Sequence, residues 1–299
     1  MISWESKLRL DDATSISIGI LLLAALPPRA VGQAKPPATV TSRSHPLVEG
    51  TFHSKSLQRD IRYRVLLPRG YEAGTERFAV LYLLHGLDGD YTDWTTNSKV
   101  QDYAQPLPLI IVMPDADDSW YTNSATVPAD KFEDYIVKDL IVEIDARFRT
   151  EASRSARAVA GLSMGGYGAL KFALKYPEMF AFAGSLSGAL DAPLHLDERV
   201  PEYREKLLVA FGPHGGPVRS ANDLFQLVAR ADAAHLPYLY IACGTEDGFL
   251  PINREFVSSL PGRKIAFEYH ETPGDHSWDY WDRSVRDLLR STAKALNLG

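Results

Sequence analysis

Residues 157–170, with the sequence RAVAGLSMGGYGAL, decide the predicted fold. A short apolar strand, Arg157 to Ala160, leads into Gly161-Leu162-Ser163-Met164-Gly165, which fits the pattern GxSxG, and a helix follows from Tyr167 to Tyr176. A serine at the tip of so tight a strand-to-helix turn requires glycine on either side, because a Cβ there would collide with neighbouring atoms. The stretch therefore predicts a nucleophile elbow with Ser163 at its tip, in preference to an ordinary glycine-rich turn.

Strands and helices alternate on both sides of this turn. Continuously apolar runs, typical of strands buried on both faces of a parallel sheet, occupy residues 78–84, 108–113, 158–160, 182–186 and 238–242. Apolar residues at helical spacing lie from Phe132 to about Phe148, and a closing helix carries Trp281, Val285, Leu288 and Leu289 on one face. Residues 51–57 and 61–67 are also strand-like and form a predicted hairpin. The pattern predicts an α/β fold in which a mostly parallel central sheet has helices on both faces and an N-terminal antiparallel hairpin.

Length and composition favour one folded domain over residues 50–299. The chain has 299 residues, of which 45% are apolar and 23% charged, and no repeat or linker divides this range. Residues 191–235 interrupt the alternation of strands and helices, so they either cap a site or form a surface helical insertion. A net charge of −6 without a basic run argues against nucleic acid as a partner. The single cysteine, Cys243, excludes an internal disulfide and a multi-cysteine metal cluster.

The first 34 residues are predicted to be a signal peptide. Residues 16–26 form an apolar run that is too short to span a membrane but typical of the hydrophobic region of a signal peptide. Ala30, Gly32 and Ala34 follow as small residues suited to cleavage, although acidic residues before the run oppose the usual positive charge. Residues 35–49 would then be the flexible start of an exported protein that is not stably inserted in a membrane.

A serine hydroxyl is a weak nucleophile near neutral pH, so it needs a histidine to take its proton and a carboxylate to orient that histidine. In folds with this elbow the chain order is serine, acid, histidine. Asp247 lies on the loop after the strand at 238–242, with Glu246 beside it as the alternative acid. His276 follows the last strand-like run and precedes the final helix. The order predicts Ser163, Asp247 and His276 as a catalytic triad.

Two backbone N–H groups are expected to bind the negative oxygen that forms when the serine attacks a carbonyl. Met164 follows the nucleophile and begins a helix whose positive end faces that oxygen. Leu87, in the loop His85-Gly86-Leu87 after the strand at 78–84, is the second predicted donor. The side chain of His85 is expected to orient this loop and not to transfer protons.

Aromatic residues near the motif loops give a weaker indication of substrate contacts. The predicted contacts are Trp94, Trp120, Tyr121 and Trp278, and the alternative for each is packing beneath the loops. Asp115, Asp117 and Asp118 are interpreted as a solvated loop, and neither a metal nor another cofactor is expected.

Four motifs together resemble the esterase family of α/β hydrolases that includes esterase D, tributyrin-type esterases, feruloyl esterases and the antigen 85 mycolyltransferases. They are YLLHGL at 82–87, GLSMGGYGAL at 161–170, GTED at 244–247 and GDHSW at 274–278, and the likeness spans about residues 50–295. The resemblance implies the α/β-hydrolase fold and ester chemistry at the five residues predicted above. Antigen 85 proteins have aspartate in place of His85, which weakens an acyltransferase interpretation, and a signal peptide argues against the cytosolic role of esterase D.

The expected function is that of an exported serine carboxylic-ester hydrolase that acts through an acyl-enzyme. Its expected substrates are small-molecule esters with short acyl chains, or acetyl and feruloyl esters of carbohydrates. Three alternatives stay open: an acyltransferase to a sugar hydroxyl, a thioesterase like S-formylglutathione hydrolase, and a non-catalytic binding module. The sequence predicts neither the acyl group, nor the alcohol, nor the oligomeric state.

Overall fold

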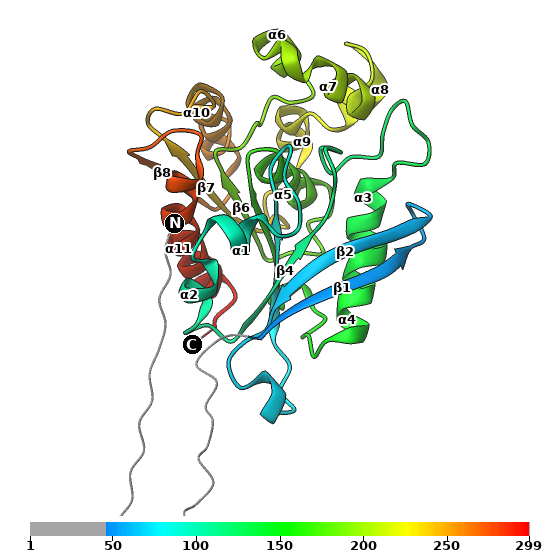
Figure 1. Cartoon of the computed structure of the whole chain (residues 1–299). Helices are drawn as coiled ribbons and strands as arrows, with labels where there is room; N and C mark the ends of the chain where they lie inside the picture. Colours follow the sequence, from blue (N-terminus) through cyan, green and yellow to red (C-terminus); the bar gives the residue numbers. More distant parts are fainter. Residues whose placement is uncertain (1–45, 299) are drawn as a thin grey trace, which may run out of the picture. The chain divides into compact units, whose positions relative to one another are not determined.

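The computed structural model describes residues 46–298, so the predicted signal peptide and nearly all of the predicted flexible segment lie outside the described residues. The strands are β1 (Leu47–Ser54), β2 (Arg59–Leu66), β3 (Ala79–Leu84), β4 (Leu109–Pro114), β5 (Arg157–Leu162), β6 (Phe182–Leu186), β7 (Tyr238–Gly244) and β8 (Phe267–Thr272). They form one eight-stranded sheet in the order β1-β2-β4-β3-β5-β6-β7-β8 (Figure 1).

The sheet is mixed, with its antiparallel part at the N-terminal end. β1 and β2 form an antiparallel hairpin that pairs Leu47 with Leu66, and β2 is also antiparallel to β4. From β4 through β8 all neighbouring strands are parallel. The predicted fold is confirmed, although β1 begins four residues before the predicted start at Thr51 and ends at Ser54.

Helices cover both faces of the sheet. One face carries α1 (Asp93–Asn97), α2 (Val100–Ala104) and α11 (Trp278–Ala295). The other carries α3 (Phe132–Asp134), a π-helical turn (Tyr135–Leu140), α4 (Ile141–Arg147), α5 (Met164–Lys175), α9 (Leu224–Arg230) and α10 (Leu250–Ser258). Along β3, Leu81 and Leu83 face the first group of helices, whereas Val80 and Tyr82 face the second. Burial on both faces explains why the strand is continuously apolar.

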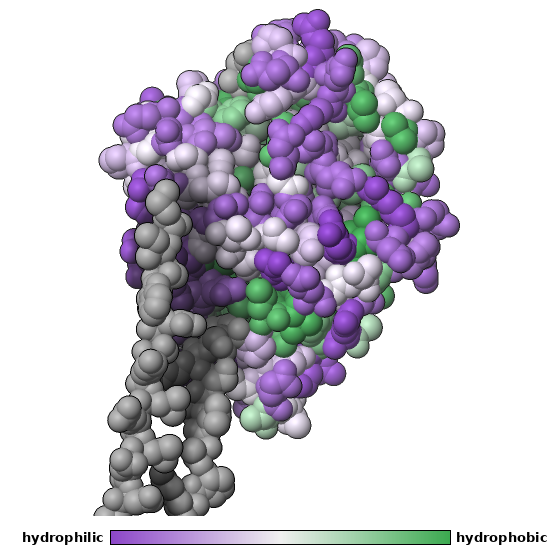
Figure 2. All heavy atoms as spheres, viewed as in Figure 1, coloured by the Kyte–Doolittle hydropathy of each residue, from purple (hydrophilic) through white to green (hydrophobic). Residues whose placement is uncertain are grey.

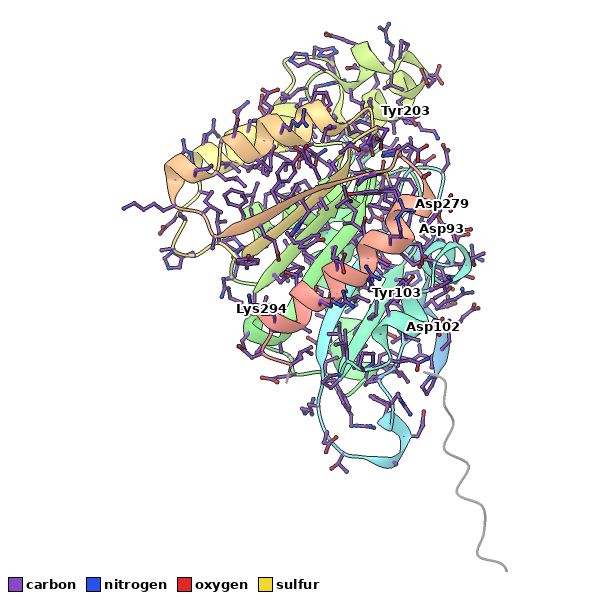
Figure 3. The ribbon with its side chains drawn as sticks, turned by 90° about the vertical axis from the view of Figure 1, so that its left-hand side faces the viewer. Asp93, Asp102, Tyr103, Tyr203, Asp279 and Lys294 are labelled. Atoms are coloured by element: carbon purple, nitrogen blue, oxygen red, sulfur yellow. The ribbon has the colours of Figure 1, made fainter. Side chains whose placement is uncertain are left out.

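Polar contacts fix α2 beside α11, and Figure 3 labels Tyr103 of α2 next to that helix. The Tyr103 hydroxyl donates to Asp282 Oδ2 at 3.1 Å, and the Lys99 N–H donates to Asp282 Oδ1 at 2.6 Å. These contacts hold the start of α11, which begins two residues after His276.

Among the described residues, no helix combines the length and the apolar character that crossing a membrane requires. The face seen in Figure 2 is mostly hydrophilic, with apolar residues in small groups.

The predicted insertion at 191–235 is helical. It contains α6 (Leu196–Arg199), a 3-10 turn (Pro201–Tyr203), α7 (Arg204–Phe211), α8 (Pro217–Ala221) and α9. α6, α7 and α8 lie together at the top of Figure 1. Lys206 of α7 forms ion pairs with Asp88 and Asp118, so the insertion contacts the loop that holds Leu87. Figure 3 shows Tyr203 at the same end of the fold as Asp279, near the start of α11.

Candidate active site

Ser163 lies in the sharp turn between β5 and α5, in the left-handed region of backbone space with φ 50° and ψ −114°. That conformation is unfavourable for a residue with a side chain, and tight packing holds it. A Cβ on Gly161 would lie 2.6 Å from the backbone of Gly165, and a Cβ on Gly165 would lie 2.6 Å from the carbonyl oxygens of Leu84 and His85. The absence of side chains at the two motif glycines therefore lets α5 pack directly against β5 and the end of β3.

The structure brings the three predicted triad side chains together from three separate segments. His276 Nε2 lies 3.0 Å from Ser163 Oγ, and His276 Nδ1 lies 2.9 Å from Asp247 Oδ2. The Asp247 carboxylate is fully buried, while 32% of the His276 side chain is exposed. A serine, an imidazole and a carboxylate in this order form a hydrogen-bonded relay that opens to solvent at the imidazole.

Asp247 is held as an anion. Burial alone would raise the pKa of Asp247, but hydrogen bonds from His276 and from the Phe249 N–H outweigh burial and lower it below its ordinary value. Glu246, the alternative acid, is exposed and instead accepts hydrogen bonds from the Gly274 N–H at 2.6 Å and the Thr245 hydroxyl at 2.8 Å. Of the two neighbouring acids, only Asp247 contacts His276.

The loop that holds Leu87 lies against the elbow. A Cβ on Gly86 would be 2.6 Å from Leu162 Cδ1 and 3.6 Å from Ser163 Cβ. Met164 supplies the other predicted amide, at the first position of α5, where an N–H has no partner within the helix. Both predicted N–H groups therefore belong to segments that adjoin Ser163.

His85 orients this loop through its own ring. The Ala116 N–H donates to His85 Nε2 at 3.0 Å, so Nδ1 carries the proton and donates to the Gly86 carbonyl oxygen at 2.7 Å. A trans peptide is planar, with its C=O and N–H pointing in opposite directions. Fixing the Gly86 carbonyl therefore also fixes the direction of the Leu87 N–H. The expectation that His85 orients the loop agrees with these contacts.

Three of the four aromatic residues predicted as substrate contacts are buried. Trp94 and Trp120 are 1% exposed and Tyr121 is 0% exposed. Trp94 donates to the Leu84 carbonyl at 3.1 Å, and Tyr121 donates to the His85 carbonyl at 3.0 Å. Trp94 and Tyr121 thus support the loops through a hydrogen bond and Trp120 through its buried ring, so none of the three lines an open surface. Trp278 is partly exposed and packs edge-on against Trp94, with ring centroids 5.3 Å apart.

The sequence analysis missed Phe249, whose ring lies 4.9 Å from that of His276, centroid to centroid. The Trp281 ring lies at the same distance, edge-on to the imidazole; it was predicted on one face of the closing helix and among the aromatic residues near the motif loops. Both rings pack against the imidazole. A signal for Phe249 was its position two residues after Asp247 on the same loop.

Within the described part of the chain, no group of three or more His, Cys, Asp or Glu side chains is arranged to hold a metal ion.

Comparison with known proteins shows the family of the chain. The family model described as "Putative esterase" matches residues 54–291. The chain belongs to this esterase family. It is 26% identical over 264 residues to an acetyl esterase of Caldicellulosiruptor saccharolyticus. That match covers 83% of this chain and 98% of the acetyl esterase.

Two further relatives extend the comparison. The chain is 35% identical over 250 residues to Esterase Rv1288 of Mycobacterium tuberculosis, covering 75% of this chain but 54% of that esterase. Among solved structures it is similar to FphF, described as a fluorophosphonate-binding serine hydrolase of Staphylococcus aureus, with a TM-score of 0.75 and 26% identity. That match covers 85% of this chain and 99% of FphF. The predicted family is therefore confirmed.

Proposed function

We propose that this esterase hydrolyses carboxylic esters through a covalent acyl-enzyme on Ser163. The single observation that carries the proposal is the relay from Ser163 Oγ to His276 Nε2 at 3.0 Å and from His276 Nδ1 to Asp247 at 2.9 Å. Ser163 Oγ attacks the ester carbonyl carbon while its proton passes to His276 Nε2. The Leu87 and Met164 amides stabilise the negative oxygen of the tetrahedral intermediate.

The reaction is completed in two stages, collapse of this intermediate to the acyl-enzyme and hydrolysis of the acyl-enzyme. The bond between the carbonyl carbon and the alcohol oxygen breaks, and His276 donates its proton to the departing alcohol. Water next attacks the acyl carbon as His276 takes one of its protons. The bond between that carbon and Ser163 Oγ then breaks, His276 returns the proton to Oγ, and the acid is released. Asp247 stays ionised throughout and stabilises the imidazolium that forms in each stage.

The proposed substrates are esters of short acyl groups, or acetyl and feruloyl esters of carbohydrates. Relatives of the chain include proteins named acetyl esterase and endo-1,4-beta-xylanase/feruloyl esterase, which favours this class. Trp278, partly exposed two residues after His276, is the proposed aromatic contact of the substrate. Export is also proposed, on the apolar run at 16–26 alone.

The test compares the wild type with Ser163→Ala on p-nitrophenyl acetate. We expect the substitution to remove most of the activity, leaving only the rate that substrate binding and the two amides supply. Near wild-type turnover by Ser163→Ala would refute the proposal. A panel of acetyl, butyryl, feruloyl and thioester substrates, with and without a carbohydrate acceptor, then separates the alternatives. Free acid indicates a hydrolase, a new sugar ester a transferase, and preference for the thioester a thioesterase.

A further inference from the structure

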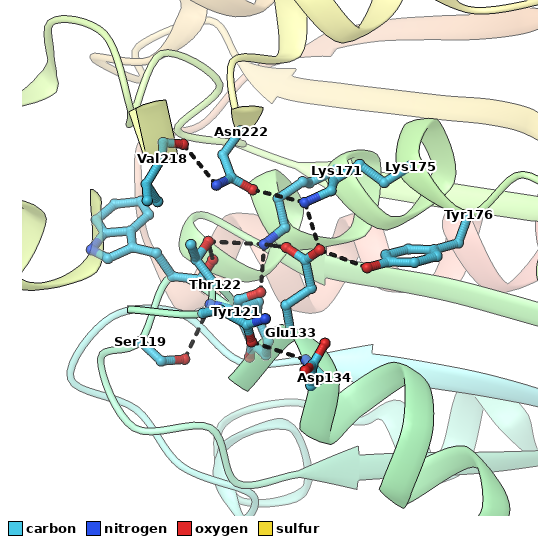
Figure 4. A network of polar contacts seen from close by, with 12 residues as sticks. Ser119, Tyr121, Thr122, Glu133, Asp134, Lys171, Lys175, Tyr176, Val218 and Asn222 are labelled. Atoms are coloured by element: carbon cyan, nitrogen blue, oxygen red, sulfur yellow. Dashed lines mark hydrogen bonds and ion pairs between the residues drawn. The ribbon is translucent and has the colours of Figure 1, made fainter. Parts of the chain in front are cut away.

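A buried lysine lies on the nucleophile helix α5 and takes no part in the mechanism above. Lys171 is 0% exposed, and each of its three ammonium hydrogens has an acceptor (Figure 4). The acceptors are Glu133 Oε2 at 2.9 Å, Thr122 Oγ1 at 2.8 Å and the Tyr121 carbonyl oxygen. An apolar side chain at this position would avoid the cost of removing a charge from water. The retained charge points to a role in holding its three acceptors in place.

One of its acceptors belongs to a strained segment. Trp120 and Tyr121 are consecutive and both left-handed, with φ 55° and 52°. Bulky residues rarely adopt this conformation, and it persists only where the surrounding structure holds it. Lys171 binds the Tyr121 carbonyl, and the Thr122 hydroxyl donates to the Trp120 carbonyl at 2.9 Å. The ammonium group thus lies at the centre of the contacts that hold this turn.

The turn connects α5 to the loop of the predicted oxyanion hole. The Tyr121 ring lies on Gly168, where a Cβ would come within 2.7 Å of the ring. At its other end the Tyr121 hydroxyl donates to the His85 carbonyl at 3.0 Å. The next peptide contains the Gly86 carbonyl, which the His85 ring holds, and the Leu87 N–H. A continuous series of directional contacts therefore joins Lys171 to the amide of Leu87.

We propose that Lys171 is a positioning residue that sets the direction of the Leu87 N–H through Tyr121 and His85. The inference rests on the proposed function, because it takes the Leu87 N–H as a donor to the oxyanion. Without the ammonium group the strained turn at 120–121 relaxes, and the Tyr121 hydroxyl no longer fixes the His85 carbonyl. The Leu87 N–H then tilts away from the oxyanion, and a hydrogen bond weakens steeply with misalignment.

The test uses Lys171→Met and Tyr121→Phe, with Lys175→Met as the matched control. Lys175 binds the other oxygen of Glu133 from the next turn of α5 and also Asn222. Lys175→Met therefore removes a positive charge beside the same Glu133 carboxylate but leaves the hydrogen bond from Lys171 to the Tyr121 carbonyl intact. Glu133 keeps Lys175 and the Tyr176 hydroxyl as partners in Lys171→Met, so that substitution leaves no unpaired carboxylate.

We expect Lys171→Met and Tyr121→Phe each to lower kcat on p-nitrophenyl acetate by about tenfold, a fraction of the loss caused by removing an oxyanion donor. KM should change less than twofold, and the double variant should be no slower than the slower single variant, because the two contacts act in series. Lys175→Met should keep kcat within twofold of the wild type. The melting temperature of each variant is measured alongside.

Three outcomes would overturn the inference. Lowered melting temperatures with kcat within twofold in both test variants would show a purely structural role. An equal loss of kcat in Lys175→Met would show a general effect of charge. As the third outcome, a wild type without Ser163-dependent esterase activity would refute the proposed function itself, and this inference with it.

If Lys171→Met does not fold, Tyr121→Phe decides alone, since it keeps the ring and loses only the hydroxyl.

Discussion

Asp247 and Glu246 are adjacent carboxylates, and their contacts separate their roles. Asp247 accepts from His276 Nδ1, whereas Glu246 accepts from Gly274 and Thr245. An amide in place of Asp247 would favour the wrong tautomer of His276, leaving no free Nε2 to accept the serine proton. We therefore expect Asp247→Asn to lower kcat by up to about 10⁴-fold on p-nitrophenyl acetate, as in other triads.

The matched control for that measurement is Glu246→Gln, which removes a neighbouring charge without altering the contact to His276. Its kcat should stay within about threefold of the wild type, because surface charges have small effects. Equal losses in the two variants would contradict the assignment of Asp247. The motif GTED left both acids open, and only the backbone of the loop, which turns Asp247 inward, distinguishes them.

Glu133 links two helices on the same face of the sheet, α3 and α5. Burial would raise the pKa of Glu133, but the ammonium groups of Lys171 and Lys175 outweigh burial and lower it to about 2 from 4.5. A carboxylate with a lowered folded-state pKa stabilises the fold above its unfolded pKa. That stabilisation is lost as the pH falls from about 4.5 toward about 2.

We therefore expect the difference in unfolding free energy between the wild type and Glu133→Gln to be roughly 2 kcal/mol smaller at pH 3 than at pH 6. Urea unfolding at both pH values measures it. Glu255→Gln, on the exposed side of α10, serves as the control and should show little difference at either pH. A Glu133→Gln difference that is the same at both pH values would contradict the role of the ion pair.

The bounds of helices and strands that depend on the local sequence pattern were predicted well. Bounds that depend on pairing with residues distant in the sequence were not. The helix from Phe132 ends at Arg147, next to the predicted Phe148, and β6 has the predicted bounds. The start of β1 was missed because its outer face is exposed and its extent depends on pairing with β2. Lys171 resembles any lysine in a helix, and only the fold shows that it meets Glu133 inside the protein.

The candidate site followed from motif order because each motif comes at the end of a strand where the sheet places its loops. The residues that support these loops from beneath could not be predicted from motif order. For Trp94, Trp120 and Tyr121 the sequence left open both substrate contact and packing beneath the motif loops, and the structure shows packing, because large aromatic rings gain free energy from burial. The insertion left two alternatives open, and the pairing of Lys206 with Asp88 places it beside the loop of Leu87.

Across the whole molecule, the turn after β5, the loop after β7 and the segment just before α11 must meet at one end of the sheet for Ser163 to be reactive. Reaction with a fluorophosphonate, followed by mass spectrometry of the peptides, tests this most directly. We predict one adduct per chain, on Ser163, and a much slower reaction in His276→Ala, which lacks the base. Esterase activity in a protein that takes no adduct on Ser163, or an adduct formed equally fast without His276, would contradict the account.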